Sequence, residues 1–412
     1  MKKILLFAML AGGLSMFAQP TCGHDHKQEE KFAANPQARM MYQEGREFID
    51  SRVAQQRQGA EASSPAAVVT IPVVFHVLYK NSGQNISETR INQQLATLNA
   101  DFRKLNADFA SVVPAEFQSV AADTEIMFCL ATVDPSGNPT TGITRKQVAG
   151  TFNFDNNYYT AAGQPVWDPL RYLNIWIGPF SSGDLLGFTY SPLFNTGQND
   201  DGVVIDYKFI GNSGNLGAPY NKGRTAVHEV GHWLGLEHIW GSGNCNGSGD
   251  GVADTPPTFG PYYECPSYPA YDYACPTSET PSMTMNYMDY VNDACMAMFT
   301  QGQKTKMHNI LNTFRSVLLT SNGCNSLDVS DAEALRAISV YPNPVSQFFM
   351  ISSPHHGIDK VEIFNQNGQL VKSQKLDGLT SKVHIEDLET GVYYLRIYNA
   401  GEFLKSDKII KK

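Results

Sequence analysis

The chain has 412 residues, enough for two or three domains with a sizeable core. Its formal net charge is −9, from 31 Lys and Arg against 40 Asp and Glu. This mildly acidic balance comes without a basic stripe, so we expect no nucleic-acid partner and no anionic membrane partner.

Residues 1–19 have the pattern of a secretory signal peptide. Lys2 and Lys3 precede an apolar run that begins at Ile4. The run is too short for a membrane helix, and no later stretch reaches that length. We therefore expect a soluble, exported protein.

The seven cysteines of an exported chain should form disulfides, and an odd number leaves one unpaired. They are Cys22, Cys129, Cys245, Cys265, Cys275, Cys295 and Cys324. Cys22 stands apart, in a polar segment at 20–64 that predicts a propeptide or flexible arm rather than a domain. We expect His24 and His26 beside it to be incidental. Lipid modification of Cys22 is the alternative, but Gln-Pro-Thr precedes it where lipoprotein signals have small residues.

Strand and helix patterns alternate after residue 67. The β-branched run at 68–80 predicts a strand. A helix is predicted at 87–106, capped by Ser87, and its apolar face comprises Ile91, Leu95, Leu98, Phe102 and Leu105. Further strands are predicted at 125–135, 172–180, 186–193 and 201–210. This order predicts an α/β (α+β) domain in which helices pack on a twisted, mixed sheet.

The remaining chain combines a loop, a helix and a second domain. Residues 241–282 are rich in Gly, Pro, Ser, Tyr and Cys, and a loop of that length needs covalent staples. A helix capped by Thr300 is predicted at 300–319. Short strands and turns, with a hairpin turn at Asn367-Gly368, predict an all-β immunoglobulin-like sandwich at 337–412.

These patterns divide the chain into five parts. They are a signal peptide (1–19), a propeptide (20–51), a central α/β domain (52–326), a linker (327–336) and the C-terminal sandwich (337–412).

The sequence HEVGHWLGLEH at 228–238 predicts a metal site. On a helix, His228 and His232 lie on one face and both reach a single metal ion. Gly235 lets the helix end in a left-handed conformation, and His238 then supplies a third ligand. Three protein ligands leave a fourth position open, as in catalytic rather than structural zinc sites.

Glu229 is placed to act as general base on water bound to that zinc, and to pass the proton to the leaving amine. Three alternatives remain. The histidines could be satisfied by core hydrogen bonds, or the chain could be an exported adhesin or binding module with a structural or inactive zinc site. A thermolysin-like peptidase would take its third ligand from a downstream Glu, which the spacing of His238 disfavours.

The zinc motif resembles that of the metzincin metallopeptidases. In MNYMDY at 285–290, Met288 matches the methionine of the turn under the metal, and Tyr290 matches a tyrosine that helps to hold the tetrahedral intermediate. Core filling is the alternative for Met288. Together with VADTPP and NYMDYVNDACMAMFT, the motif GRTAVHEVGHWLGLEHIWG resembles the pappalysin family over roughly 68–324.

That resemblance implies two crossed disulfides, Cys245–Cys275 and Cys265–Cys295, among the three pairings that four cysteines permit. We expect Cys129 and Cys324 to pair, with two buried thiols as the alternative. The family also implies structural calcium near the loop, with Asp254 as ligand and Asp250 as a weaker candidate.

The family further implies cleavage before basic residues. A carboxylate in the specificity pocket explains that choice, and Asp293 is the candidate, with Asp289 more structural. Cys22 is predicted to hold the zymogen latent as a cysteine switch, by filling the open zinc position. Alternatives are a disulfide to another molecule or a leftover thiol. The activating cut is expected at Ser51-Arg52, with Arg39, Arg46 and Arg57 as rivals.

YPNP at 341–344 and the final KSDKIIKK resemble the C-terminal sorting domains of type IX secretion in Bacteroidetes. The resemblance implies the type IX secretion machinery as partner, removal of the domain after export, and a place outside or on the surface of a Gram-negative cell. A carbohydrate- or partner-binding sandwich is the alternative. We expect a monomer once mature, acting on protein and peptide substrates.

Overall fold

The computed structural model describes residues 21–58, 68–213, 217–241, 243, 245, 249–272, 274–275, 280–324, 337–353, 357–399 and 402–412. The predicted signal peptide (1–19) and linker (327–336) lie outside the described residues. The chain divides into two compact units, Met1–Cys324 and Asn325–Lys412. No helix in the described part of the chain is both long and apolar enough to cross a membrane.

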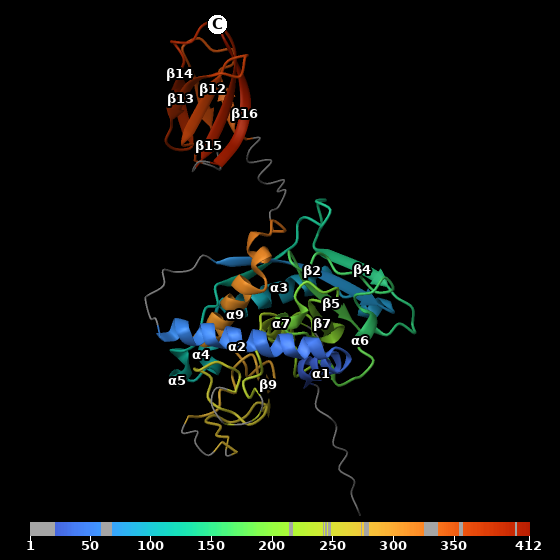
Figure 1. Cartoon of the computed structure of the whole chain (residues 1–412). Helices are drawn as coiled ribbons and strands as arrows, with labels where there is room; N and C mark the ends of the chain where they lie inside the picture. The colour runs from blue at the N-terminus through green and yellow to red at the C-terminus, as the bar shows by residue number, and fades with distance from the viewer. Residues whose placement is uncertain are drawn as a thin grey trace, which may run out of the picture. The chain divides into compact units, whose positions relative to one another are not determined.

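The first unit is built on a mixed sheet, which the described residues form from seven strands (Figure 1). Its order is β1-β6-β7-β5-β2-β3, and β4 pairs with β2 beside β3. The β6–β7 pair is antiparallel, and the other pairs are parallel. The strands are β1 (Thr21–Cys22), β2 (Val69–Tyr79), β3 (Ile126–Leu130), β4 (Ile143–Gln147), β5 (Leu173–Gly178), β6 (Leu185–Thr189) and β7 (Val203–Asp206).

The β-branched run becomes the central strand β2 because both of its faces are covered. Every residue from Ile71 to Leu78 is buried. Such continuous apolar runs are typical of strands covered on both faces. A strand lies within each of the stretches predicted at 68–80, 125–135, 172–180, 186–193 and 201–210, although 186–193 ends in helix α7 and 201–210 continues into the 3-10 turn η2. Strand β4 was not predicted. Its residues alternate between half-buried and exposed, a weak apolar signal.

Two long helices pack against this sheet and each other. They are α3 (Glu88–Phe102) and the zinc-motif helix α8 (Arg224–Trp233). Ser87 caps α3, as predicted, by accepting a hydrogen bond from the Arg90 N–H. The prediction that Leu105 belongs to the buried face is wrong. The chain turns through Lys104 (φ 53°), and Leu105 is 73% exposed.

The helix at 300–319 is confirmed as α9 (Gln301–Thr313), with Thr300 as its cap, but it ends early. Residues Ser316–Thr320 form the 3-10 turn η3 instead. Shorter elements complete the unit: α4 (Phe109–Val112), α5 (Ala115–Gln118), α6 (Phe154–Asn157), α7 (Pro192–Asn195), η1 (Ser82–Gln84), η2 (Tyr207–Phe209), β8 (Tyr263–Glu264) and β9 (Tyr290–Val291).

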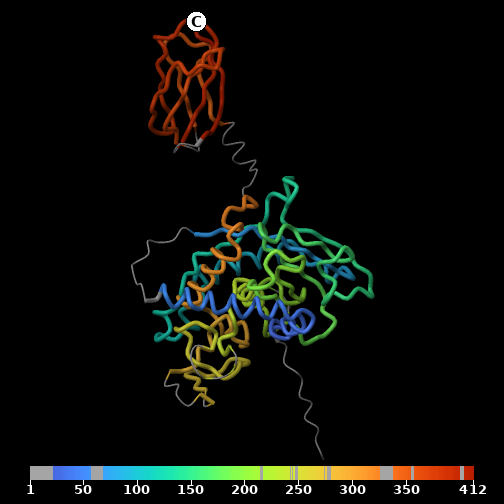
Figure 2. Tube along the Cα trace, viewed as in Figure 1, coloured from blue at the N-terminus to red at the C-terminus, as the bar shows by residue number. Residues whose placement is uncertain are grey.

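The segment at 20–64 is not a flexible arm over its described part. It forms β1 and two helices, α1 (His24–Ala34) and α2 (Pro36–Gln58). Figure 2 shows both helices lying along the first unit, where α1 contacts β6 and α2 contacts α7 and α9. The sequence was misleading because these helices are polar, with only scattered apolar anchors such as Phe32 and Ile49.

The second unit is the predicted β-sandwich. One sheet has the order β10-β11-β14 and the other β13-β12-β15-β16. The hairpin turn at Asn367-Gly368 connects β12 to β13. The strands are β10 (Ser339–Tyr341), β11 (Phe348–Ser352), β12 (Lys360–Phe364), β13 (Leu370–Lys375), β14 (Thr380–His384), β15 (Gly391–Asn399) and β16 (Glu402–Lys411).

Candidate active site

Helix α8 and the turn after it bring three histidines together. His232 Nε2 lies 3.1 Å from the Nε2 atoms of both His228 and His238. Gly235 (φ 84°) makes the turn, and a Cβ there would lie 2.5 Å from Ile310, so both backbone and space require glycine. One ligand atom from each histidine and from Cys22 lies within 4.8 Å of the other three.

The second nitrogen of each ring has its own partner. The Nδ1 of His228 lies 2.7 Å from the Tyr287 carbonyl, and that of His232 lies 2.8 Å from the Leu236 carbonyl. Such Nδ1–H donation fixes the tautomer and leaves each Nε2 lone pair facing the centre. Burial lowers the pKa of His228 to about 3, which keeps the ring neutral. The donor set therefore fits zinc.

Strand β1 places Cys22 at this centre. The Gly23 N–H donates to the Gly187 carbonyl of β6 (2.8 Å), and the His24 N–H points at Cys22 Sγ (3.3 Å). The expectation that His24 is incidental is wrong. Its ring is buried and stacks on His232 with 4.0 Å between centroids, and its Nδ1 lies 2.7 Å from the Thr189 carbonyl.

The neighbouring residues of the propeptide segment differ in role. Asp25 accepts a hydrogen bond from His238 Nδ1 at 3.0 Å. His26 is largely exposed, as expected. A polar segment with no sequence pattern therefore supplies three contacts at the centre, through Cys22, His24 and Asp25.

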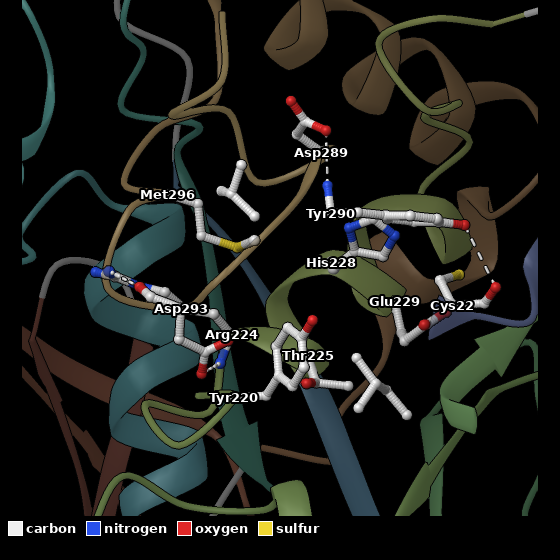
Figure 3. A pocket seen from close by; sticks show the side chains of 12 residues that line it. Cys22, Tyr220, Arg224, Thr225, His228, Glu229, Asp289, Tyr290, Asp293 and Met296 are labelled. Carbon is white, nitrogen blue, oxygen red and sulfur yellow. Dashed lines mark hydrogen bonds between the residues drawn. The ribbon is translucent and has the colours of Figure 1, made fainter. Parts of the chain in front are cut away.

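Glu229 is fully buried beside the Cys22 thiol (Figure 3). Burial raises the pKa of Glu229 to about 8, and the neighbouring thiol offsets only part of that rise. Tyr290 also reaches Cys22, and its hydroxyl donates to the Cys22 carbonyl at 3.3 Å (Figure 3). Both groups thus face Cys22, which strand β1 holds at the centre.

Met288 lies against helix α8. A Cβ at Gly231 would lie 2.6 Å from Met288 Sδ, so glycine permits the close approach. The Met288 N–H donates to Asn286 Oδ1, and Asn286 in turn exchanges hydrogen bonds with Gln303 of α9. The methionine turn is therefore fixed between the helix that bears two of the histidines and α9.

A pocket opens beside the histidines (Figure 3). Its lining comprises Cys22, Leu186, Tyr220, Arg224, Thr225, His228, Glu229, Asp289, Tyr290, Val291, Asp293 and Met296. Asp293 Oδ2 accepts hydrogen bonds from the backbone N–H groups of Lys222 (2.7 Å) and Arg224 (3.2 Å). Burial raises the pKa of Asp293 to about 6, although these two hydrogen bonds oppose the rise.

Asp289 faces a different set of partners. Its Oδ1 accepts hydrogen bonds from the N–H groups of Tyr262 and Tyr290, which agrees with a structural role.

Sequence reasoning missed Tyr220, Thr225 and Arg224 of the pocket. The Arg224 guanidinium bonds to Asp101 and Asp108, and the GRTA sequence before the zinc motif was the available signal.

The two calcium candidates have protein partners. The Asp254 carboxylate accepts hydrogen bonds from the Thr300 hydroxyl (2.7 Å) and the Gly302 N–H (2.9 Å), at the start of α9. Asp250 Oδ1 accepts from the Val252 N–H and the Thr255 hydroxyl. Calcium stays a prediction.

The disulfide pairing is confirmed for all six remaining cysteines, which lie within the described residues. The pairs are Cys129–Cys324, Cys245–Cys275 and Cys265–Cys295. Cys22 is the free cysteine of that part of the chain.

A mixed sheet, a helix with two histidines, a third histidine past a glycine turn and a methionine turn beneath them together define a metzincin-type metallopeptidase. Residues 138–312 match the family described as pregnancy-associated plasma protein-A, and residues 339–412 match the secretion system C-terminal sorting domain. The chain belongs to the pappalysin family of metallopeptidases and ends in a type IX sorting domain.

Individual relatives agree with this assignment. An extracellular metalloprotease of Colletotrichum graminicola is 31% identical over 76% of this chain and 98% of its own length. One of Pyricularia oryzae is 30% identical over 76% and 97%. The chain is therefore similar to secreted proteases over nearly their whole length.

Solved structures are similar too. Mature mirolysin of Tannerella forsythia, in complex with a cleaved peptide, is 44% identical over 64% of this chain and all of its own, with a TM-score of 0.60. A promirolysin mutant from the same species is 42% identical over 73% and 97%, with a TM-score of 0.62. The protein is thus a secreted metallopeptidase of a zinc-dependent class.

Proposed function

We propose that the chain is the latent form of a zinc endopeptidase that cleaves peptide bonds before basic residues. The observation that carries the proposal is the convergence of His228, His232, His238 and Cys22 on one centre, with Glu229 beside it. In this proposal the three histidines hold the zinc, and Cys22 is the fourth ligand of the latent enzyme.

When bound, zinc acts as a Lewis acid and lowers the pKa of coordinated water to about 7. Glu229 accepts the proton of the attacking water and passes it to the leaving amine. The Tyr290 hydroxyl, which now donates to the Cys22 carbonyl, donates to the oxygen of the scissile carbonyl as negative charge develops there.

The test is the isosteric variant Glu229→Gln in the activated protein, assayed on casein. We expect cleavage to fall by about 10² to 10⁴-fold, because a general acid–base contributes that much. Zinc content, measured by mass spectrometry, should equal that of the wild type. A control is Glu116→Gln, an exposed carboxylate on α5, which should cleave at the wild-type rate. Casein cleavage by Glu229→Gln at the wild-type rate would contradict the proposal, because another group would then act as the base. Failure of the activated wild type to cleave casein would favour an inactive binding module.

Latency is proposed to rest on Cys22 and its neighbours. The segment Cys22–Asp25 covers the histidines, because Cys22 joins the ligand cluster, His24 stacks on His232 and Asp25 bonds to His238. Removal of residues 20–51 then uncovers the centre. The cut at Ser51-Arg52 falls within helix α2, so that helix must open locally before cleavage.

Preference for basic residues is proposed to rest on Asp293. Its buried carboxylate lines the pocket beside His228, together with Glu229 and Asp289, and a guanidinium or ammonium group bound there would pair with it. The backbone donors from Lys222 and Arg224 hold one oxygen and fix the direction of the other. Arg, with its bidentate fork, is the favoured side chain.

Three finer proposals concern the rest of the chain. Calcium is proposed near residues 250–255, and metal analysis after exhaustive dialysis checks it, because a structural site retains calcium beside zinc. The type IX machinery is proposed to recognise residues 337–412 and to release a protein that acts as a monomer. The calcium proposal follows from the family resemblance, and recognition by the secretion machinery follows from the sorting-domain match.

A further inference from the structure

We propose that the catalytic unit has a second site for a basic side chain, which binds Lys or Arg several residues before the scissile bond. The site is the Asp200 cage, formed by Tyr190, Asn195 and Asp200. Lys31 of helix α1 occupies it here. The inference rests on the proposed function, in which residues 20–51 are removed and the cage is vacated.

The cage encloses the Lys31 ammonium group from three sides. Lys31 Nζ lies 2.7 Å from Asp200 Oδ2 and 2.9 Å from Asp200 Oδ1. It also donates to Asn195 Oδ1 at 2.5 Å. The ring of Tyr190 lies beneath it, with 4.0 Å from Nζ to the ring centroid. A carboxylate, an amide oxygen and an aromatic face are the partners that a cationic side chain prefers.

The catalytic unit builds the cage without help from Lys31. Asn195 and Asp200 are 1% and 9% exposed. The Asn195 N–H donates to the Ser191 carbonyl within α7, and the Tyr158 hydroxyl donates to the Asp200 carbonyl. Among the described residues, Asn195 Nδ2 is buried and has no hydrogen-bond partner.

Loss of Lys31 leaves the Asp200 carboxylate and the Asn195 amide oxygen without their cation, beside the face of Tyr190. A carboxylate, an amide oxygen and an aromatic face together attract a new cationic partner. The neighbouring lysine of α1, Lys27, has different partners. It donates to the exposed side chains of Glu30 and Asn156.

Strand β6 sets where the cage lies along a substrate. Cys22, at the centre, pairs with Gly187 in the middle of β6. The Asp293 pocket is lined by Leu186, toward the start of β6, whereas Tyr190 follows its last residue, Thr189. If the pocket takes the residue after the scissile bond, the residues before that bond extend toward Tyr190 and the cage.

The chain length between Cys22 and Lys31 gives the reach. Two extended steps of about 3.3 Å lead from Cys22 to His24, and seven helical steps of about 1.5 Å lead on to Lys31, so the two residues lie at most about 17 Å apart. An extended substrate covers that distance with about five residues, at about 3.3 Å each. The cage is thus placed to bind a side chain at most about five residues before the scissile bond.

The experiment compares quenched fluorescent peptides that share one cleavage site with Arg after the scissile bond. One set carries a single Lys at each position from two to six residues before the bond, and the matched set carries norleucine there. The activated wild-type enzyme should cleave one Lys peptide, near the fourth or fifth position, with kcat/KM about tenfold above its norleucine match. That is the size of one charge-assisted contact in a partly exposed site.

The variant Asp200→Asn should bring this ratio close to one, and Glu116→Gln should keep the wild-type ratio. If the wild type cleaves the Lys and norleucine peptides equally at every position, the proposed cage site is overturned. This outcome is read from the wild type alone and does not depend on whether a variant folds. Cleavage of none of the peptides would instead contradict the proposed function. A Lys preference that persists in Asp200→Asn would also overturn the assignment to this cage.

Discussion

A buried ion pair anchors the end of helix α8, and its removal is the most quantitative test of how the active site is supported. Arg315 and Asp201 are each 1% exposed. The guanidinium donates to both Asp201 oxygens, at 2.8 and 3.0 Å, and its Nε donates to the Trp233 carbonyl. The Trp233 indole N–H also donates to Asp201, and the guanidinium lies 3.7 Å from the centre of the Trp233 ring.

The perturbation is Asp201→Asn, which keeps the shape and removes the charge. Arg315 then stays buried without a counter-ion, a change that costs about 3–5 kcal/mol. One kcal/mol lowers the Tm of a domain of this size by about 2–4 °C, so we expect a fall of about 10 °C. The four tryptophans lie at 167, 176, 233 and 240, in the first unit, so their fluorescence follows its thermal unfolding and not that of the sandwich.

The matched control is Asp168→Asn, which changes the same group in an exposed pair with Arg171. Exposed pairs contribute up to about 1 kcal/mol, so its Tm should change by less than about 3 °C. A Tm for Asp201→Asn within that range would refute the reasoning, since the buried pair would then contribute no more than the exposed one.

Three further predictions concern the active site. The proform Cys22→Ala should cleave casein at least about tenfold faster than the wild-type proform; equal activity and equal maturation would exclude the cysteine switch. Because burial raises the pKa of Asp293 to about 6, its carboxylate is charged above that pH and neutral below it. We therefore expect the ratio of kcat/KM for a peptide with Arg after the scissile bond to that for its norleucine match to be lower at pH 5 than at pH 7. The same pH dependence of this ratio in Asp293→Asn would exclude the Asp293 carboxylate as the cause. Chelation of the activated enzyme should abolish cleavage, and zinc should restore it; activity that survives with no zinc detected would exclude a catalytic metal.

The parts of the fold and site that lie close together in sequence were the predictable ones. The spacing of His228, His232 and His238 depends on one helix and one glycine turn, so eleven residues contain the whole pattern. The run of β2 is apolar because both faces are covered. The pocket combines Cys22 with residues from 186 to 296, which no local pattern connects.

The propeptide segment shows why the rest escaped prediction. Helices α1 and α2 have few apolar residues, and their conformation depends on docking, through contacts such as Lys31 with Asp200 and Arg46 with Glu237. Helix stability in proteins comes mostly from tertiary packing, so a sequence that folds only against its partner surface looks disordered by composition. His24 was misjudged for the same reason, because nothing near it in sequence indicates the ring of His232.

The disulfide between Cys129 and Cys324 also has a mechanical consequence. Cys324 is the last residue of the first unit, directly before the chain that leads to the sorting domain, and Cys129 lies on β3 of the sheet. A pulling force on the residues after Cys324 would therefore pass through a covalent bond into the sheet. Helix α9 and the η3 turn lie in sequence between the two cysteines, so such a force would bypass them and leave the support of the active site in place.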